Sequence, residues 1–326
     1  MIKIAVVGAG NLGSRHLQAL SLLDREAQIY VIDPSDRSLE VARSRFLETY
    51  NPDSAITVSY AKEIESLPEA VDVVINATSS DVRRKVIEKL LTGRRVKHLI
   101  LEKVLFQEIE DYSAVGNLIE EKQVHTWVNC TRRAFPGYQW LRGELKGVRF
   151  LGLEVLGSQW GLASNCIHML DLFSFLTGQA DYLFNAVELD RDVVPSKRAG
   201  FCELTGTVRG TMGDSTSFSI ASFQQGTLPL MVRIAADSIA VIIRETEGKA
   251  FIARGSDGWR WEDAPFQILY QSQVTHSIVK DLVDNGKCEL PSYELSEKLH
   301  VPLIEMYLGH FRRILNNPTL NSCPIT

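Results

Sequence analysis

Three features are scarce in this 326-residue sequence, and each excludes a class of protein. The five cysteines are odd in number and never at C-x-x-C spacing, so we expect neither a disulfide framework nor a structural zinc site, and a reducing, cytoplasmic compartment. No apolar run approaches the roughly 20 residues that span a bilayer, so we expect no membrane partner. The formal net charge is −5, without a long run of like charge, which argues against nucleic-acid binding.

What is present is an ordinary globular composition, with 45% hydrophobic and 23% charged residues. The length exceeds that of one typical domain. We expect two domains, residues 1–130 and residues 131–326. The N-terminus runs directly into the first predicted strand, so we expect no signal peptide.

The start of the chain contains the motif around which the rest is organised. An apolar run, residues 2–7, leads into Gly8, Gly10 and Gly13 at G-x-G-x-x-G spacing, and a helical pattern follows. In a nucleotide-binding turn the first glycine permits the tight turn. The second lets the backbone approach a pyrophosphate, and the third lets the helix pack closely on the strand.

The residues around this turn would hold a dinucleotide. N–H groups at the start of the following helix, at Asn11 and Leu12, bind phosphates. A second apolar strand ends at Asp33, at the distance after Gly13 where a carboxylate accepts hydrogen bonds from a ribose 2′-OH. Alternatively, Asp33 only ends the strand and helps to start the next helix. Since Asp33 would repel a 2′-phosphate, we expect NAD rather than NADP, with Arg37 nearby acting in the opposite direction.

Strands alternate with helices through the rest of the first domain, which predicts an α/β fold with a Rossmann-type, doubly wound parallel sheet. The further predicted strands are residues 56–60, 71–77, 97–103 and 124–130. In such a sheet, ligands bind beyond the carboxyl ends of the strands. Thr78, Ser79 and Glu102 would therefore line the cofactor cleft, although Thr78 or Ser80 could equally cap the next helix.

After about residue 147 the pattern changes to long alternating segments punctuated by glycines, which predicts an α+β domain with a large open antiparallel sheet. Helices would cover one face, and a second subunit the other, giving a homodimer or homotetramer. A helix over residues 164–176 would have Ser164 or Asn165 as its N-cap. Two helices, residues 267–284 and 292–315, close the chain and could pack back on the first domain.

The glycine motif, a Glu-Lys pair at a strand end and a His-x-x-Asp helix before a large sheet follow one another along the chain. In that order they resemble the glucose–fructose oxidoreductase/inositol dehydrogenase/MocA (Gfo/Idh/MocA) family, over almost the whole sequence. The resemblance implies an NAD-dependent oxidoreductase. Such an enzyme transfers a hydride between the nicotinamide and a carbinol or keto carbon of a sugar, sugar derivative or cyclitol.

The resemblance also assigns roles to single positions. In Glu102-Lys103-Val104, similar to the family's Glu-Lys-Pro, Lys103 would contact substrate and stabilise a developing alkoxide. His168 and Asp171 match the family's Asp-x-Gly-x-His-x-x-Asp helix, whose histidine is the usual acid/base candidate. A core histidine is the plainer alternative for His168. No metal is implied, because no third ligand is spaced to join this pair. The substrate-binding candidates are Asn129, Arg132, Arg133, Trp160, Ser164 and Asn165.

Two departures from the family pattern affect these assignments. Val104 replaces the proline, and a non-proline cis bond costs about 2.5–4 kcal/mol, so we expect a trans bond after Lys103. Ser164 and Cys166 replace the first Asp and the Gly of the histidine motif, so a carboxylate beside the histidine is missing. Both departures point to a second hypothesis, a catalytically degenerate NAD-binding sensor or scaffold. A third hypothesis is an enzyme of elimination or epimerisation that acts through a transient keto intermediate.

Overall fold

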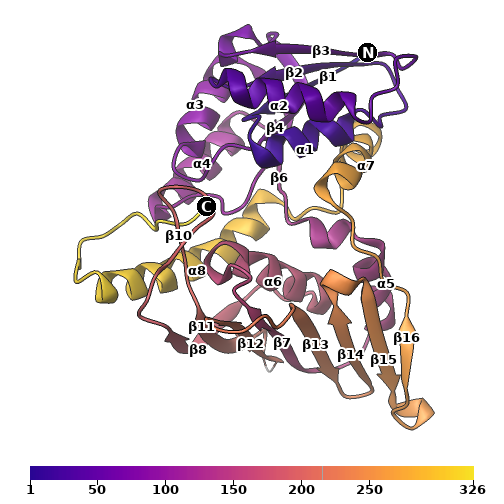
Figure 1. The fold of residues 1–326 in the computed structure, drawn as a ribbon, viewed down its shortest axis with the longest axis vertical. Coiled ribbons are helices and arrows are strands. Elements are labelled where there is room, and N and C mark those ends of the chain that lie inside the picture. The colour runs from indigo at the N-terminus through magenta and orange to yellow at the C-terminus, as the bar shows by residue number, and fades with distance from the viewer. Residues whose placement is uncertain (215) are drawn as a thin grey trace. The chain divides into compact units, whose positions relative to one another are not determined.

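The computed structural model describes residues 1–214 and 216–326, which form two compact units (Figure 1). The first unit consists of residues 1–106, 110–134 and 269–294. The second consists of residues 107–109, 135–268 and 295–326. Each unit is therefore built from segments that are far apart in the sequence.

The first unit is the expected alternation of strands and helices. Its elements are β1 (Ile2–Val7), α1 (Asn11–Leu20), β2 (Ala27–Ile32), α2 (Asp36–Leu47), β3 (Ile56–Ala61), β4 (Ala70–Asn76), α3 (Arg83–Gly93), β5 (Arg95–Leu101), α4 (Ile109–Glu121), β6 (His125–Val128) and α7 (Gln271–Asn285). The six strands are all parallel and lie in the order β3-β2-β1-β4-β5-β6. This is the Rossmann order, with its switch point between β1 and β4.

The core of the first unit is built on strands that are nearly continuously apolar, as expected for strands covered on both faces. Ile4, Val6, Val73 and Leu99 are all fully buried. Helix α7 comes from much later in the chain and packs against α1. The buried side of α1 therefore faces a helix that the N-terminal segments of this unit do not contain.

The second unit is an α+β domain. Its elements are α5 (Pro136–Glu144), β7 (Phe150–Ser158), α6 (Leu162–Thr177), β8 (Tyr182–Leu189), β9 (Val194–Pro195), β10 (Cys202–Glu203), β11 (Gly206–Met212), β12 (Thr216–Phe223), β13 (Met231–Ala236), β14 (Ile239–Arg244), β15 (Lys249–Arg254), β16 (Trp261–Ala264) and α8 (Tyr293–Ile314). Neither α5 nor β8 was expected from the sequence.

Eight strands form one large sheet in the order β16-β15-β14-β13-β7-β12-β11-β8. The sheet is mixed rather than wholly antiparallel, because β7 pairs with β12 in parallel and with β13 antiparallel. A parallel pair needs a long crossover, and here the chain passes through α6 between the two strands. Figure 1 shows α5, α6 and α8 on one side of this sheet. Among the described residues, no helix has the length and apolar character needed to cross a membrane.

Helix α6 differs in its start from the sequence expectation. The expected N-cap was Ser164 or Asn165, but the helix begins at Leu162 and its N-cap is Gly161, with a φ of 78°. The backbone there is left-handed, which glycine adopts readily. Apolar side chains cover almost the whole circumference of the helix, so it is largely buried.

Candidate active site

The three glycines have three different surroundings in the turn after β1. Gly8 has a φ of +89°, and a Cβ there would lie 2.9 Å from the backbone nitrogen of Thr78, in the turn after β4. A Cβ on Gly13 would lie only 1.8 Å from the carbonyl oxygen of Gly8. Gly8 therefore serves a left-handed turn, and Gly13 a close contact between helix and strand end.

Gly10 differs from both, because its Cβ position faces open space. Among the described residues, apart from Gly10 itself and its neighbours in the chain, no atom lies within 4 Å of the Cβ that Gly10 lacks. Gly10 is also the N-cap of α1, and within residues 1–214 and 216–326 no side chain caps this helix and no acidic residue lies in its first turn. The first N–H groups of the helix, which include those of Asn11 and Leu12, lack intrahelical partners. This combination fits a dinucleotide pyrophosphate.

Asp33 lies beside this turn, directly after β2. Its Oδ2 accepts a hydrogen bond from the backbone nitrogen of Ala9 at 2.7 Å, and its Oδ1 accepts one from that of Ser35 at 2.8 Å. Each carboxylate oxygen has a second lone pair, so a ribose hydroxyl can still be bound. Ser35 caps α2 by accepting from the backbone nitrogen of Ser38. Arg37 is exposed in the first turn of α2.

Thr78 and Ser79 follow β4 and are half-buried. The Thr78 hydroxyl donates to Oδ1 of Asn76 at 2.6 Å. The alternative in which Thr78 or Ser80 is the N-cap of the next helix is wrong, because α3 begins at Arg83 and its N-cap is Val82. The Thr78 side chain therefore stabilises the end of β4 instead.

A network of buried side chains surrounds Glu102, directly after β5. His16 of α1 lies 2.8 Å from Glu102 (Nε2 to Oε1) and 2.8 Å from Thr275 of α7 (Nδ1 to Oγ1). Asn129, after β6, donates through Nδ2 to Oε1 of Glu102 and, at 2.9 Å, to Oε1 of Gln271. The remaining oxygens, Oε2 of Glu102 and Oδ1 of Asn129, are buried without a hydrogen-bond partner in the part of the chain that the structure describes. Two acceptors therefore remain available to a donor.

Glu102 is ionised in this network. Burial acts to raise its pKa, but the hydrogen bond with His16 and the positive charges of His16, Lys103 and Arg83 bring the pKa below its usual value. A buried carboxylate thus lies next to Lys103 in the sequence, and the positive charge of that lysine acts on it.

The remaining candidates of the first unit lie in its short 3₁₀ helix Thr131–Ala134. Arg133 is buried and Arg132 is half-buried. Both follow Asn129 closely in the sequence and belong to the same unit as the glycine turn and Lys103.

The candidates of the second unit lie at the start of α6. Two of them use their N–H groups on the backbone: Nε1 of Trp160 donates to the carbonyl of Ala221 at 2.8 Å, and Nδ2 of Asn165 donates to that of Trp160 at 3.0 Å. His168 is half-buried and Asp171, one turn later, is 1% exposed. Ser164 and His168 stand at i and i+4 and share one face of the helix.

Comparison with known proteins agrees with this geometry. Residues 2–130 match the sequence profile of GFO_IDH_MocA, described as an oxidoreductase family with an NAD-binding Rossmann fold. Residues 2–130 therefore belong to the Gfo/Idh/MocA family. A search of curated proteins found no match.

Solved structures resemble the chain over both units. One is UDP-N-acetylglucosamine 3-dehydrogenase GnnA from Acidithiobacillus ferrooxidans, with a TM-score of 0.72 and 17% identity over 94% of this chain and 96% of that one. Another is an oxidoreductase from Agrobacterium radiobacter in complex with NAD+, L-tartaric acid and magnesium, with a TM-score of 0.71 and 16% identity over 93% and 94% of the two chains. A third is a super-repressor mutant of Gal80p from Saccharomyces cerevisiae, with a TM-score of 0.70 and 15% identity over 96% of each chain. At these identities the likeness concerns the fold.

The loop that corresponds to the Gfo/Idh/MocA Glu-Lys-Pro segment differs from our expectation. The Lys103–Val104 bond is cis, not trans. The loop is held by Arg83, a side chain only 1% exposed, whose guanidinium donates to the carbonyls of Leu105 (2.8 Å), Val104 and Thr78. Sequence reasoning missed Arg83, because an arginine in the charged run 83–85 is typical of an exposed helix.

The acid that is missing from the Gfo/Idh/MocA histidine motif has a counterpart elsewhere in the chain. Glu203 of β10 accepts hydrogen bonds from the backbone nitrogen of Ser164 at 3.2 Å and from the Ser164 hydroxyl. A carboxylate therefore lies at the start of α6, on the face that carries His168. No sequence signal pointed to Glu203, which is far from Ser164 along the chain.

Cys166, at the glycine position of the motif, is fully buried, and burial raises the pKa of its thiol to about 12. The thiol is therefore protonated at neutral pH and unsuited to act as a nucleophile. Its neighbour Tyr307 of α8 donates to the carbonyl of Leu162 at 3.0 Å.

Proposed function

We propose that this protein is an NAD-dependent dehydrogenase that transfers a hydride between the nicotinamide and a carbinol or keto carbon of a sugar, sugar derivative or cyclitol. The observation that carries the proposal is the turn after β1, where Gly10 leaves open space in front of an uncapped helix. The UDP-sugar dehydrogenase activity of one protein of similar fold supports a sugar-related substrate.

NAD is the proposed cofactor rather than NADP. The carboxylate of Asp33 is fixed beside the turn by Ala9 and would bind the adenosine ribose hydroxyls but repel a 2′-phosphate. Arg37, which is exposed in the first turn of α2, would act in the opposite direction and favour NADP. Glu102, Thr78 and Ser79 complete the cofactor side, with the two unpartnered oxygens of Glu102 and Asn129 ready to accept hydrogen bonds.

Proton transfer and charge stabilisation are assigned to different side chains of the candidate site. When bound, NAD supplies the hydride acceptor. In the oxidation direction, His168 takes the substrate hydroxyl proton on an imidazole nitrogen, and cationic Lys103 stabilises the negative charge that develops on the oxygen. Glu203 and Asp171 are proposed to orient and charge-balance the imidazole. The arginines Arg132 and Arg133 would bind polar groups of the substrate.

The test is NADH formation at 340 nm with a panel of sugars, polyols and sugar nucleotides. We expect Lys103→Ala and His168→Ala to lower turnover by about 10²- to 10⁴-fold while NADH binding, followed by its fluorescence, is retained. Lys122→Ala and His125→Ala serve as matched controls, since both side chains are exposed. Full turnover in either catalytic variant would refute the assignment.

The second candidate function is an NAD-binding sensor or scaffold without turnover. The replacement of the motif Asp by Ser164 favours it, as does the likeness in fold to a super-repressor mutant of Gal80p. NADH binding of normal affinity, without turnover on any member of the panel and with a ligand-dependent change in partner binding, would support this function over the first.

The second unit, with residues 131–326 as its expected extent, is proposed to bind substrate and to mediate self-association. Alternation along the strands places apolar side chains on the sheet face opposite the helices. They are Leu156, Leu183, Phe223, Met231, Ile242 and Phe251. We expect a homodimer or homotetramer, and a sedimentation experiment at micromolar concentration that finds only monomer would contradict this.

A further inference from the structure

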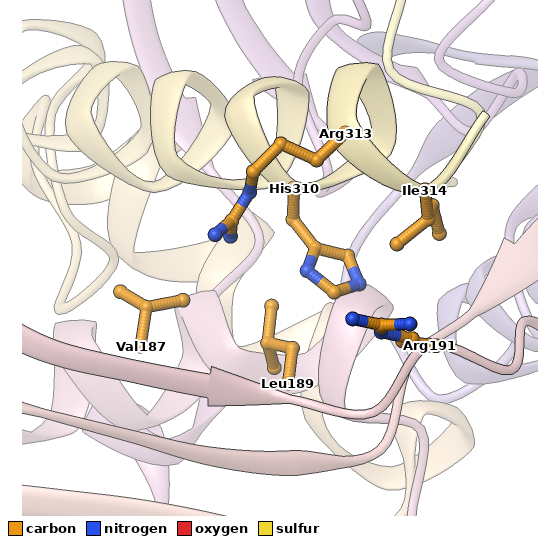
Figure 2. A pocket seen from close by; sticks show the side chains of 6 residues that line it. All are labelled: Val187, Leu189, Arg191, His310, Arg313 and Ile314. Carbon is orange, nitrogen blue, oxygen red and sulfur yellow. The ribbon is translucent and has the colours of Figure 1, made fainter. Parts of the chain in front are cut away.

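The second unit contains a cavity that the proposed chemistry does not use. It has a volume of about 410 Å³ and lies between the end of β8, the residues that follow it and the last turns of α8 (Figure 2). Its lining residues are Val187, Leu189, Arg191, His310, Arg313 and Ile314. Three of these side chains are apolar, and the other three are cationic or can become so.

The two guanidinium groups at the cavity are available to a ligand. The side chains of Arg191 and Arg313 make no ion pair or hydrogen bond with any of residues 1–214 and 216–326. The neighbouring carboxylate of Asp190 accepts a hydrogen bond from the Thr205 hydroxyl at 2.6 Å, and its negative charge acts on His310. Two like charges therefore border one hollow, where an oxyanion would be bound by both.

The imidazole of His310 lies between these two guanidinium groups (Figure 2). His310 is 3% exposed, and its Nε2 lies 3.0 Å from the carbonyl oxygen of Asp190. Since a carbonyl only accepts, Nε2 carries the proton of a neutral ring and Nδ1 is an acceptor. Burial lowers the pKa of His310, so the ring is neutral at pH 7.

The apolar part of the cavity lining indicates that the ligand also has an apolar part. Val187 and Leu189 lie on one strand of the sheet and Ile314 at the end of α8, and all three are half-buried. An inorganic ion alone would leave this surface in contact with water. A short organic group attached to the anion would cover it and remove this apolar area from water, which favours binding.

We propose that this cavity is a binding site for a small organic dianion, an oxyanion group held by Arg191 and Arg313 with its apolar part against Val187, Leu189 and Ile314. Two guanidinium groups match the charge of a phosphomonoester or of a dicarboxylate. Both classes carry pairs of oxygens, on a tetrahedral phosphate or a planar carboxylate, that arginine binds bidentately. The site is distinct in its residues from the glycine turn and from the start of α6.

The experiment is calorimetric titration of the full-length protein, saturated with NAD, with phenyl phosphate, inorganic phosphate, phenylsuccinate and benzyl alcohol. Saturation with NAD keeps phosphate out of the glycine turn. We expect phenyl phosphate or phenylsuccinate to bind more tightly than inorganic phosphate, and benzyl alcohol not to bind. The preferred anion identifies the class.

Variants locate the binding. Arg191→Gln and Arg313→Gln should each weaken it about tenfold, and the double variant should abolish it. Arg312→Gln is the matched control, because Arg312 lies on the same last turn of α8, is exposed and does not line the cavity. The proposal is overturned if no anion binds at millimolar concentration, or if Arg312→Gln weakens binding as much as the two cavity variants do.

Discussion

Acid should destabilise the first unit through His98, a buried histidine of β5. This side chain is 1% exposed, and both ring nitrogens lack a hydrogen-bond partner among the described residues. Its ring centroid lies 5.4 Å from that of Trp127 and 5.8 Å from that of His125. Burial, with smaller contributions from the charges of Lys97 and His125, lowers its pKa to about 4.

The sign and size of the effect follow from proton linkage. Above pH 6.5 the ring is neutral in the folded and unfolded chains, so His98 adds no pH dependence. As the pH falls below 6.5, the unfolded chain binds a proton that the folded chain does not, and the free energy of unfolding decreases by about 1.4 kcal/mol per pH unit. At pH 4.5 the loss amounts to about 2.5 kcal/mol, and below pH 4 it levels off.

The assay is urea unfolding of the wild type and of His98→Phe at pH 7.5 and pH 4.5, followed by far-UV circular dichroism. At each pH we subtract the free energy of unfolding of the variant from that of the wild type. This difference should fall by about 2.5 kcal/mol from pH 7.5 to pH 4.5, because only the wild type loses stability through His98 in acid. Carboxylates and the other buried histidines cancel in this difference. His98→Leu is a second variant in case the larger Phe side chain does not fit the core. His125→Phe, at an exposed position of the neighbouring strand, is the control and should not show the change of about 2.5 kcal/mol. An unchanged difference for both His98 variants would refute the reasoning.

Three further sets of substitutions test other parts of the structure. Gly10→Ala should change the free energy of unfolding by less than about 1 kcal/mol but weaken NADH binding at least tenfold. Gly13→Ala should lower the free energy of unfolding by about 3 kcal/mol or more, because its Cβ would lie 1.8 Å from a carbonyl oxygen. The same result for both variants in thermal unfolding and NADH titration would contradict this. Arg83→Met should destabilise the first unit by about 2–4 kcal/mol, since three carbonyls lose their donor, and a urea midpoint like that of the wild type would argue against it. Glu203→Gln should lower turnover and shift its pH profile, and the added substitution Ser164→Asp should restore both; a double variant no better than the single one would leave Glu203 as a helix cap alone.

The cofactor turn was predictable because its determinants are local. Gly8, Gly10, Gly13 and Asp33 all lie between the N-terminus and the end of the second strand, and each spacing follows from the geometry of one strand, one turn and one helix. The parallel sheet was predictable for a similar reason, since continuous apolar strands alternating with helices leave few other arrangements.

The residues that support the candidate catalytic groups were not predictable, because they act across long stretches of sequence. Asn129 meets Gln271 and Ser164 meets Glu203, and both pairs join distant parts of the chain. No periodicity reports such contacts. Arg83 shows a second limit, since its charge suggests a surface position while its hydrogen bonds to three carbonyls allow burial.

The divided first unit has a consequence for synthesis of the protein. Its segments before Phe135 and its segment 269–294 are separated by the stretch 135–268, which belongs to the second unit. A nascent chain therefore leaves the ribosome with one side of α1 uncovered until α7 has been translated. The first unit can therefore complete its fold only after its last segment, residues 269–294, has been synthesised.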